Sequence, residues 1–118
     1  MKLSEAIRLG SMLMPQCYGR NHVIDSYGKE VASCAIGAAA DAIGEDGLFT
    51  KMKSINIRVG CPECTINYTL SSAVVCLNDV HHWTRERIAD WVEVIEIENE
   101  INRAPIQHEV EIAELAVK

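Results

Sequence analysis

Residues 76–92, CLNDVHHWTRERIADWV, hold both tryptophans, two of the four histidines and the clearest helix start in the chain. Thr84 is a favourable N-cap because its hydroxyl can accept a backbone N–H in the first turn. Apolar residues then recur at the i, i+3, i+4, i+7 spacing of a core-facing helical stripe: Ile88, Trp91, Val92 and Ile95. The stretch therefore predicts a helix that begins after Thr84.

A second helix is predicted immediately upstream. Residues 70–77 are compact and apolar, with Ser71 or Ser72 available as the cap. Asn78 and Asp79 end this helix because their side chains compete for backbone hydrogen bonds. The predicted arrangement is a helix, a tight polar turn and a second helix. We expect Trp83 and Trp91 to pack between the two helices.

The rest of the chain is expected to pack around this pair. Glu5 to about Met14 predicts a first helix, capped by Ser4 and stopped by Pro15. An irregular connection is expected over residues 15–29. The segment from Glu30 to Ile43 is apolar almost all round and predicts a central, buried helix that ends at Gly44.

After this helix, residues 45–54 predict a turn and a short irregular piece. Two alternating runs, residues 55–59 and 66–70, flank a short tip and predict a β-hairpin. The fold class is thus mainly α, a compact bundle of four to five helices with one small β-hairpin that carries the Cys-Pro-x-Cys turn. Residues 1–104 are expected to form a single globular domain, and residues 105–118 a C-terminal tail that contains at most a short helix.

Composition limits the classes of function. The chain has 118 residues, 48% of them hydrophobic, and a net charge of −6. This charge argues against general affinity for nucleic acids or anionic membranes, because phosphate binding depends on clustered Lys and Arg. Charged residues inside the N-terminal apolar pattern argue against a signal peptide, so a cytoplasmic protein is expected. Five cysteines in that setting are expected to be thiols or metal ligands.

The strongest chemical signal is Cys61-Pro62-Glu63-Cys64. Two thiolates separated by two residues can supply half of a tetrahedral zinc site. The chain has no second pair of this kind, so the other ligands must come from elsewhere, the candidates being Cys17, His22, Cys34, His81 and His82. We predict a Zn²⁺ site formed by Cys61, Cys64, Cys17 and His81, and we assign Cys76 to the core. Reduced thiols or a redox pair remain alternatives.

Three blocks of sequence resemble a family of proteins. These are GKEVASCAIGAA (residues 28–39), the Cys-Pro-x-Cys turn, and LNDVHHWTRERIADWV (residues 77–92). Together they resemble a small family of uncharacterised bacterial and prophage-type proteins, over roughly residues 1–97. The resemblance implies one fold unit and no particular activity.

Three functions follow as hypotheses. The first is a non-enzymatic interaction or accessory module, stabilised by zinc, that binds a protein partner of unknown identity through the acidic face of the last helix (Glu86, Asp90, Glu93 and Glu100). The second is a helix-turn-helix-like nucleic-acid-binding regulator that uses Arg85 and Arg87. The third is a hydrolase with Cys34 as nucleophile and His81 as base. The sequence does not indicate an oligomeric state.

Overall fold

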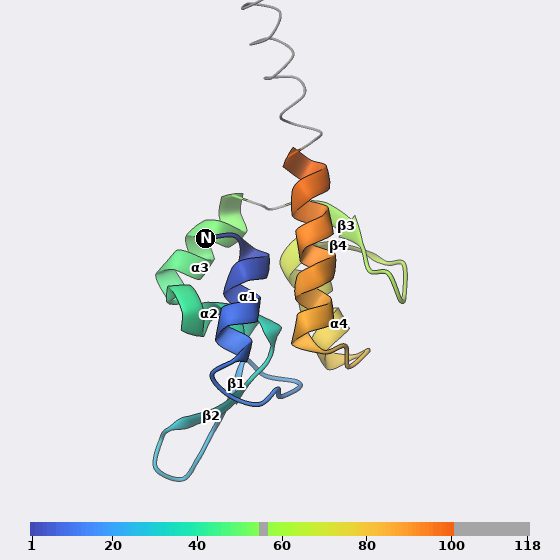
Figure 1. The fold of residues 1–118 in the computed structure, drawn as a ribbon. Coiled ribbons are helices and arrows are strands. Elements are labelled where there is room, and N and C mark those ends of the chain that lie inside the picture. The colour runs from blue at the N-terminus through green and yellow to red at the C-terminus, as the bar shows by residue number, and fades with distance from the viewer. Residues whose placement is uncertain (55–56, 101–118) are drawn as a thin grey trace, which may run out of the picture.

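The computed structural model describes residues 1–54 and 57–100, and within them it shows a mainly α-helical fold with two small antiparallel sheets (Figure 1). The last helix covers residues 85–100 of the described chain and is called the C-terminal helix below. The elements before it are α1 (Leu3–Ser11), β1 (His22–Ile24), β2 (Glu30–Ser33), α2 (Ala35–Ile43), α3 (Glu45–Ser54), β3 (Arg58–Gly60), β4 (Asn67–Thr69) and α4 (Leu70–Asp79).

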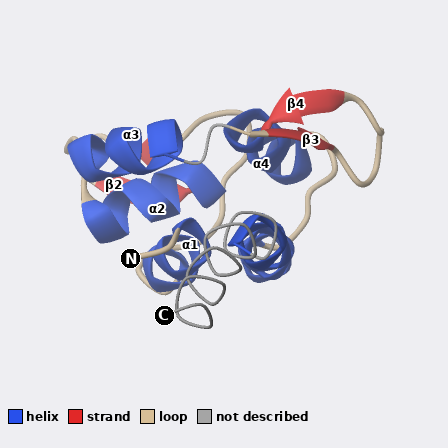
Figure 2. Cartoon of the chain, turned by 90° about the horizontal axis from the view of Figure 1, so that it is seen from above, coloured by secondary structure: helices blue, strands red, loops and turns tan. Residues whose placement is uncertain are grey.

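Seen from above, α1 and α2 lie together, and α4 lies beside β3 and β4 (Figure 2). Gly10 permits the close approach of α1 and α2, because a Cβ atom built there would lie 1.6 Å from the carbonyl oxygen of Ala38. No side chain fits in that space. The helix pair therefore depends on glycine at position 10.

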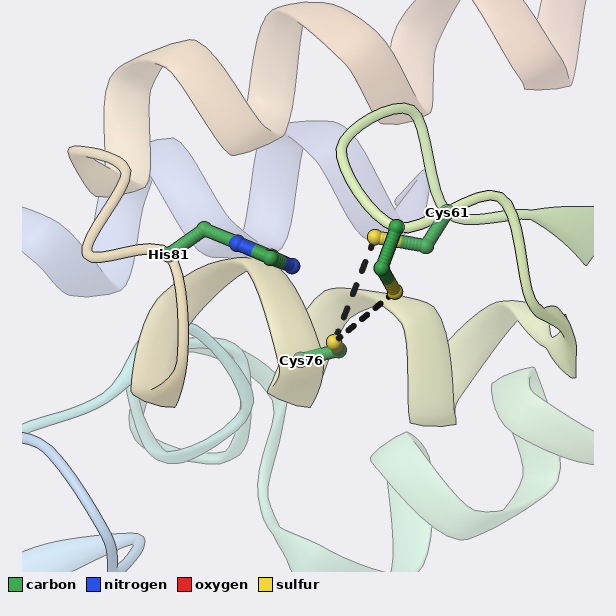
Figure 3. A group of neighbouring side chains, drawn as sticks. Cys61, Cys76 and His81 are labelled. Atoms are coloured by element: carbon green, nitrogen blue, oxygen red, sulfur yellow. Dashed lines mark hydrogen bonds between the residues drawn. The ribbon is translucent and has the colours of Figure 1, made fainter.

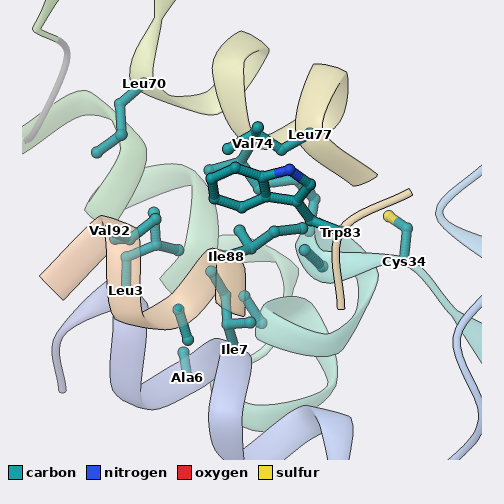
Figure 4. Packing of buried hydrophobic residues seen from close by; sticks show 14 of the residues in the cluster. Leu3, Ala6, Ile7, Cys34, Leu70, Val74, Leu77, Trp83, Ile88 and Val92 are labelled. Atoms are coloured by element: carbon teal, nitrogen blue, oxygen red, sulfur yellow. The ribbon is translucent and has the colours of Figure 1, made fainter. Parts of the chain in front are cut away.

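The core forms where α1, α2, α4 and the C-terminal helix meet (Figure 4). Trp83, which precedes the C-terminal helix, is buried against them, and Trp91 packs at the edge of the cluster. The fully buried side chains at the centre are Leu3, Ile7, Leu70, Val74, Leu77, Ile88 and Val92. The packing confirms that the apolar stripe and the tryptophans face the core.

The predicted helix from Glu30 to Ile43 is wrong in its first four residues, which form β2. This strand pairs antiparallel with β1, with Val23 opposite Ala32. The helix begins only after Cys34, whose Sγ accepts a hydrogen bond of 3.3 Å from the Gly37 N–H. Helical spacing misplaced the boundary because the segment is apolar on every side, so its periodicity does not separate strand from helix.

Other predicted boundaries also change. Residues 45–54 form α3 where an irregular piece was expected. Ser4 does not cap α1; it is buried within the helix, and the Leu3 N–H donates instead to the Glu96 carboxylate, at 3.0 Å. Thr69, not Ser71 or Ser72, caps α4. The C-terminal helix begins as predicted, with the Arg87 N–H donating to the Thr84 hydroxyl at 3.1 Å.

The two alternating runs form short strands. β3 and β4 pair antiparallel, with Val59 opposite Tyr68, and residues 61–66 join them. Residues 55–56, in the first run, and the predicted tail at 105–118 lie outside the described residues.

Candidate metal centre

The segment between β3 and β4 brings two thiols close together. The Cys61 N–H donates to the Ile66 carbonyl at 3.0 Å, and the Thr65 N–H donates to the Cys61 carbonyl at 2.8 Å. Thr65 has a φ of 58°, in the left-handed region that a tight reversal requires. These bonds fold the segment back on itself, so that Cys61 is buried and Cys64 is half-buried.

The end of α4 supplies two more potential ligands. Cys76 lies in its last turn and is 8% exposed. The N–H groups of Val80 and His81 both donate to the Cys76 carbonyl, at 2.9 and 3.2 Å, which turns the chain back after the helix. Figure 3 shows the His81 imidazole directed toward the side chains of Cys61 and Cys76.

The four side chains meet with the spacing of a metal site. One ligand atom from each of Cys61, Cys64, Cys76 and His81 lies within 4.8 Å of the others. The Sγ atom of Cys76 is 4.0 Å from that of Cys61 and 3.9 Å from that of Cys64. Zn–S bonds of about 2.3 Å at tetrahedral angles place sulfur atoms about 3.8 Å apart. The group can therefore hold a metal ion without a large movement of its sulfurs.

The protonation states of the thiols differ within this group. The neighbouring His81 imidazole is the main cause that lowers the pKa of Cys64 to about 6, and the backbone N–H of Ile66 adds to it. Burial is the main cause that raises the pKa of Cys76 to about 11, and the adjacent thiols Cys64 and Cys61 contribute to the same shift. Without a cation, thiolate is thus favoured at Cys64 and disfavoured at Cys76.

His81 carries the clearest sign of a missing partner. Its Nε2 atom is buried and forms no hydrogen bond with any described residue. A buried polar atom without a partner is costly. Coordination of a cation by Nε2 would remove that cost.

The structure brings together three of the four predicted ligands and places Cys17 elsewhere. The Cys17 thiol donates to the carbonyl oxygen of Arg20 at 3.4 Å, and its backbone N–H bonds to Ser33, so its loop is held against β2. Cys76 is buried in the core cluster, as expected, and its thiol also completes the group. The signal in the sequence is the Cys76-x4-His81 spacing, which lies within the range of about three to five residues that separates the last two ligands of Cys₂His₂ zinc sites.

Arg85 does not lie on a nucleic-acid-binding surface. Its side chain is buried, and its guanidinium donates to the carbonyl oxygens of Ser11, Met14 and Ser33 and to the Ser33 hydroxyl, at 2.8 to 3.3 Å. Burial lowers the pKa of Arg85. Arg87 is exposed and lies over the Trp83 ring, 3.7 Å from its centroid. Because its guanidinium is used inside the fold, Arg85 is not available for the predicted contact with DNA.

Cys34 lies in surroundings unsuited to a nucleophile. It is buried at the start of α2, and its thiol donates to the Asn21 side chain at 3.6 Å. Burial is the main cause that raises the pKa of Cys34, which disfavours the reactive thiolate. His81, its predicted base, points into the group of three cysteines.

The acidic face of the C-terminal helix is partly used within the chain. Arg8 forms ion pairs with Asp90 at 2.7 Å and with Glu93 at 3.0 Å. Lys2 lies 3.4 Å from Glu100. Much of this face therefore attaches α1 to the C-terminal helix.

Comparison with protein-family models, curated proteins and solved structures finds no match for this chain. Within the described residues, no helix combines the length and the apolar character that crossing a membrane requires. The evidence on function therefore comes from the residues themselves.

Proposed function

We propose that the chain is a small non-enzymatic interaction or accessory module whose fold is stabilised by one zinc ion. The ligands are Cys61, Cys64, Cys76 and His81. The observation that carries this proposal is the convergence of their four ligand atoms within 4.8 Å of one another.

The donor set favours zinc. Three thiolates and one imidazole match the ligand types of structural zinc sites, which are almost always tetrahedral. Thiolates are poor ligands for magnesium and calcium, which take oxygen donors. The observed sulfur separations of 3.9 and 4.0 Å suit a tetrahedral ion of this size.

A structural role follows from the number of ligands. Catalytic zinc keeps one position for water or substrate, whereas here protein side chains can fill all four positions. The ion would join the segment after β3 to the end of α4. Trp83 supports the same junction, because its Nε1–H donates to the Glu63 carboxylate at 2.9 Å, inside the Cys-Pro-Glu-Cys turn. Metal binding would thus contribute directly to folding.

Exposed apolar side chains near the end of α1 support a role in binding another protein. Met12 is 76% exposed and Leu13 62%, and Leu9 lies one turn earlier and is also exposed. Neighbouring exposed apolar residues are typical of surfaces that contact other proteins. A protein partner would bind here, or on the part of the acidic face that is not ion-paired.

Metal content after purification tests the proposal. We expect about one zinc per chain in the wild type, and loss of that zinc in Cys61→Ser and Cys76→Ser. Chelation should also lower the free energy of unfolding, because a ligand that binds only the folded state stabilises it.

Cys34→Ser is the matched control. Cys34 is also buried, but it lies outside the group, and serine can take over its capping role at α2. This variant should keep its zinc. Absence of zinc from the wild type after reconstitution, or equal zinc loss in Cys34→Ser and Cys76→Ser, would show that the group is not a metal site.

A further inference from the structure

A second group of potential ligands lies outside the group of three cysteines and His81, and it contains no sulfur. It consists of His22 from β1, Glu30 from β2 and Asp41 from α2, and is called the His22 cluster below. One ligand atom of each residue lies within 4.8 Å of the other two. Nothing in the zinc proposal uses these residues.

The distances in the His22 cluster match those between ligands of one metal ion. His22 Nε2 lies 2.9 Å from Asp41 Oδ1 and 3.4 Å from Glu30 Oε2. Ligand bonds of about 2.1 Å place neighbouring donors about 3.0 Å apart at octahedral angles and about 3.4 Å apart at tetrahedral angles. We propose that the His22 cluster is a second divalent-cation site, built from nitrogen and oxygen donors.

Burial and charge support this site. The side chains of His22 and Asp41 are only 14% and 13% exposed. Asp41 Oδ2 is buried and forms no hydrogen bond within the described part of the chain. The two carboxylates together carry a charge of −2. A divalent ion would balance this charge in full, whereas a proton on the imidazole would leave a net charge of −1.

The donor set also defines the class of metal. One imidazole and two carboxylates suit Zn²⁺, Mn²⁺ or Fe²⁺, and three protein ligands leave positions for water. The Glu30 side chain is 45% exposed, so solvent reaches the cluster from its side. The ion at this site would exchange with solution, in contrast to the ion enclosed by the thiolates.

The competing explanation is an ion pair, in which a protonated His22 lies between the two carboxylates and no metal binds. Equilibrium dialysis against micromolar Zn²⁺ separates the two. We expect wild-type protein to hold two zinc ions per chain, and His22→Ala and Asp41→Asn to hold one. Asn at position 41 keeps an oxygen that can accept the hydrogen bond from His22, so its loss of metal cannot be attributed to loss of that contact.

Asp46→Asn is the control, because Asp46 is an exposed carboxylate in α3 outside the cluster, and it should keep two ions. Cys61→Ser should lose the other ion, independently of His22. A wild type that holds one ion, lost in Cys61→Ser, would establish the His22 cluster as an ion pair. A second ion that persists in both His22→Ala and Asp41→Asn would also overturn the proposal. If His22→Ala loses an ion and Cys61→Ser does not, the second site stands and the thiolate site fails.

Discussion

Replacement of Asn78 by alanine should cost a large share of the stability of the fold. Asn78 is fully buried, and its side-chain amide makes four hydrogen bonds. The oxygen accepts from the Gln16 side chain at 2.8 Å and from the Ala35 N–H at 3.1 Å. The NH₂ group donates to the Cys17 carbonyl at 2.9 Å and to the Asp79 carboxylate at 2.7 Å. One side chain thus joins the loop after α1, the start of α2 and the end of α4.

The magnitude follows from the partners that would be left alone. In Asn78→Ala the backbone N–H of Ala35 and the carbonyl of Cys17 lose this bond in the interior, and each unsatisfied buried group costs about 1–3 kcal/mol. We therefore expect a loss of about 4 kcal/mol, against a total stability of about 5–15 kcal/mol for an ordinary domain. Urea denaturation at equal metal content measures the loss.

Asn99→Ala is the comparison, because Asn99 is only partly buried, lies on the C-terminal helix and has no hydrogen bond through its side chain among the described residues. It should change stability by less than about 0.5 kcal/mol. If Asn78→Ala destabilises the protein by less than about 1 kcal/mol with an unchanged m-value, the network does not hold these segments together and the reasoning is refuted.

Three further outcomes are expected. In metal-free protein at pH 7, Cys64 should react with iodoacetamide before Cys17 and Cys34, because its pKa is lowered to about 6 while burial raises theirs; mass spectrometry of partly modified protein would reveal a different order. The stability that the Cys64 thiolate contributes to metal-free protein should be complete above the ordinary thiol pKa of 9.0 and lost as pH falls to about 6, and a Cys64→Ser variant should lack this slope in urea titrations. Arg85→Ala should cost about 3 kcal/mol, because buried carbonyl groups lose their donor, whereas Arg87→Ala should cost about 1 kcal/mol for its contact with Trp83; equal effects would contradict the buried position of Arg85.

Local signals identified the last two helices well. Thr84 as a cap and the stripe from Ile88 to Val92 are short-range features, and the structure agrees with both. The same rules failed between Glu30 and Ser33, because antiparallel pairing with the preceding strand β1 overrides helical spacing. Apolar segments without a polar face carry little information about which element they form.

The candidate metal centre was predicted only in part, because some of its ligands follow a local pattern in the sequence and one does not. The Cys61 and Cys64 pair is visible in the sequence because its spacing is local, and His81 was named as one of several candidates. Cys76 was missed because it follows the helical pattern of α4, where cysteine resembles any small apolar residue. Its thiol comes to 4.0 Å from that of Cys61 because β3 and β4 pack against α4, and the local pattern contains no sign of that contact.

The hydrogen bond from the Leu3 N–H to Glu96 joins residues 93 positions apart and closes the start of α1 with a side chain from the C-terminal helix. During synthesis the first helix leaves the ribosome long before its capping carboxylate does. The N-terminal segment therefore lacks this hydrogen bond until nearly the whole described chain has emerged. Nascent chains that stop short of Glu96 should be more sensitive to proteases at their N-terminus than the released protein.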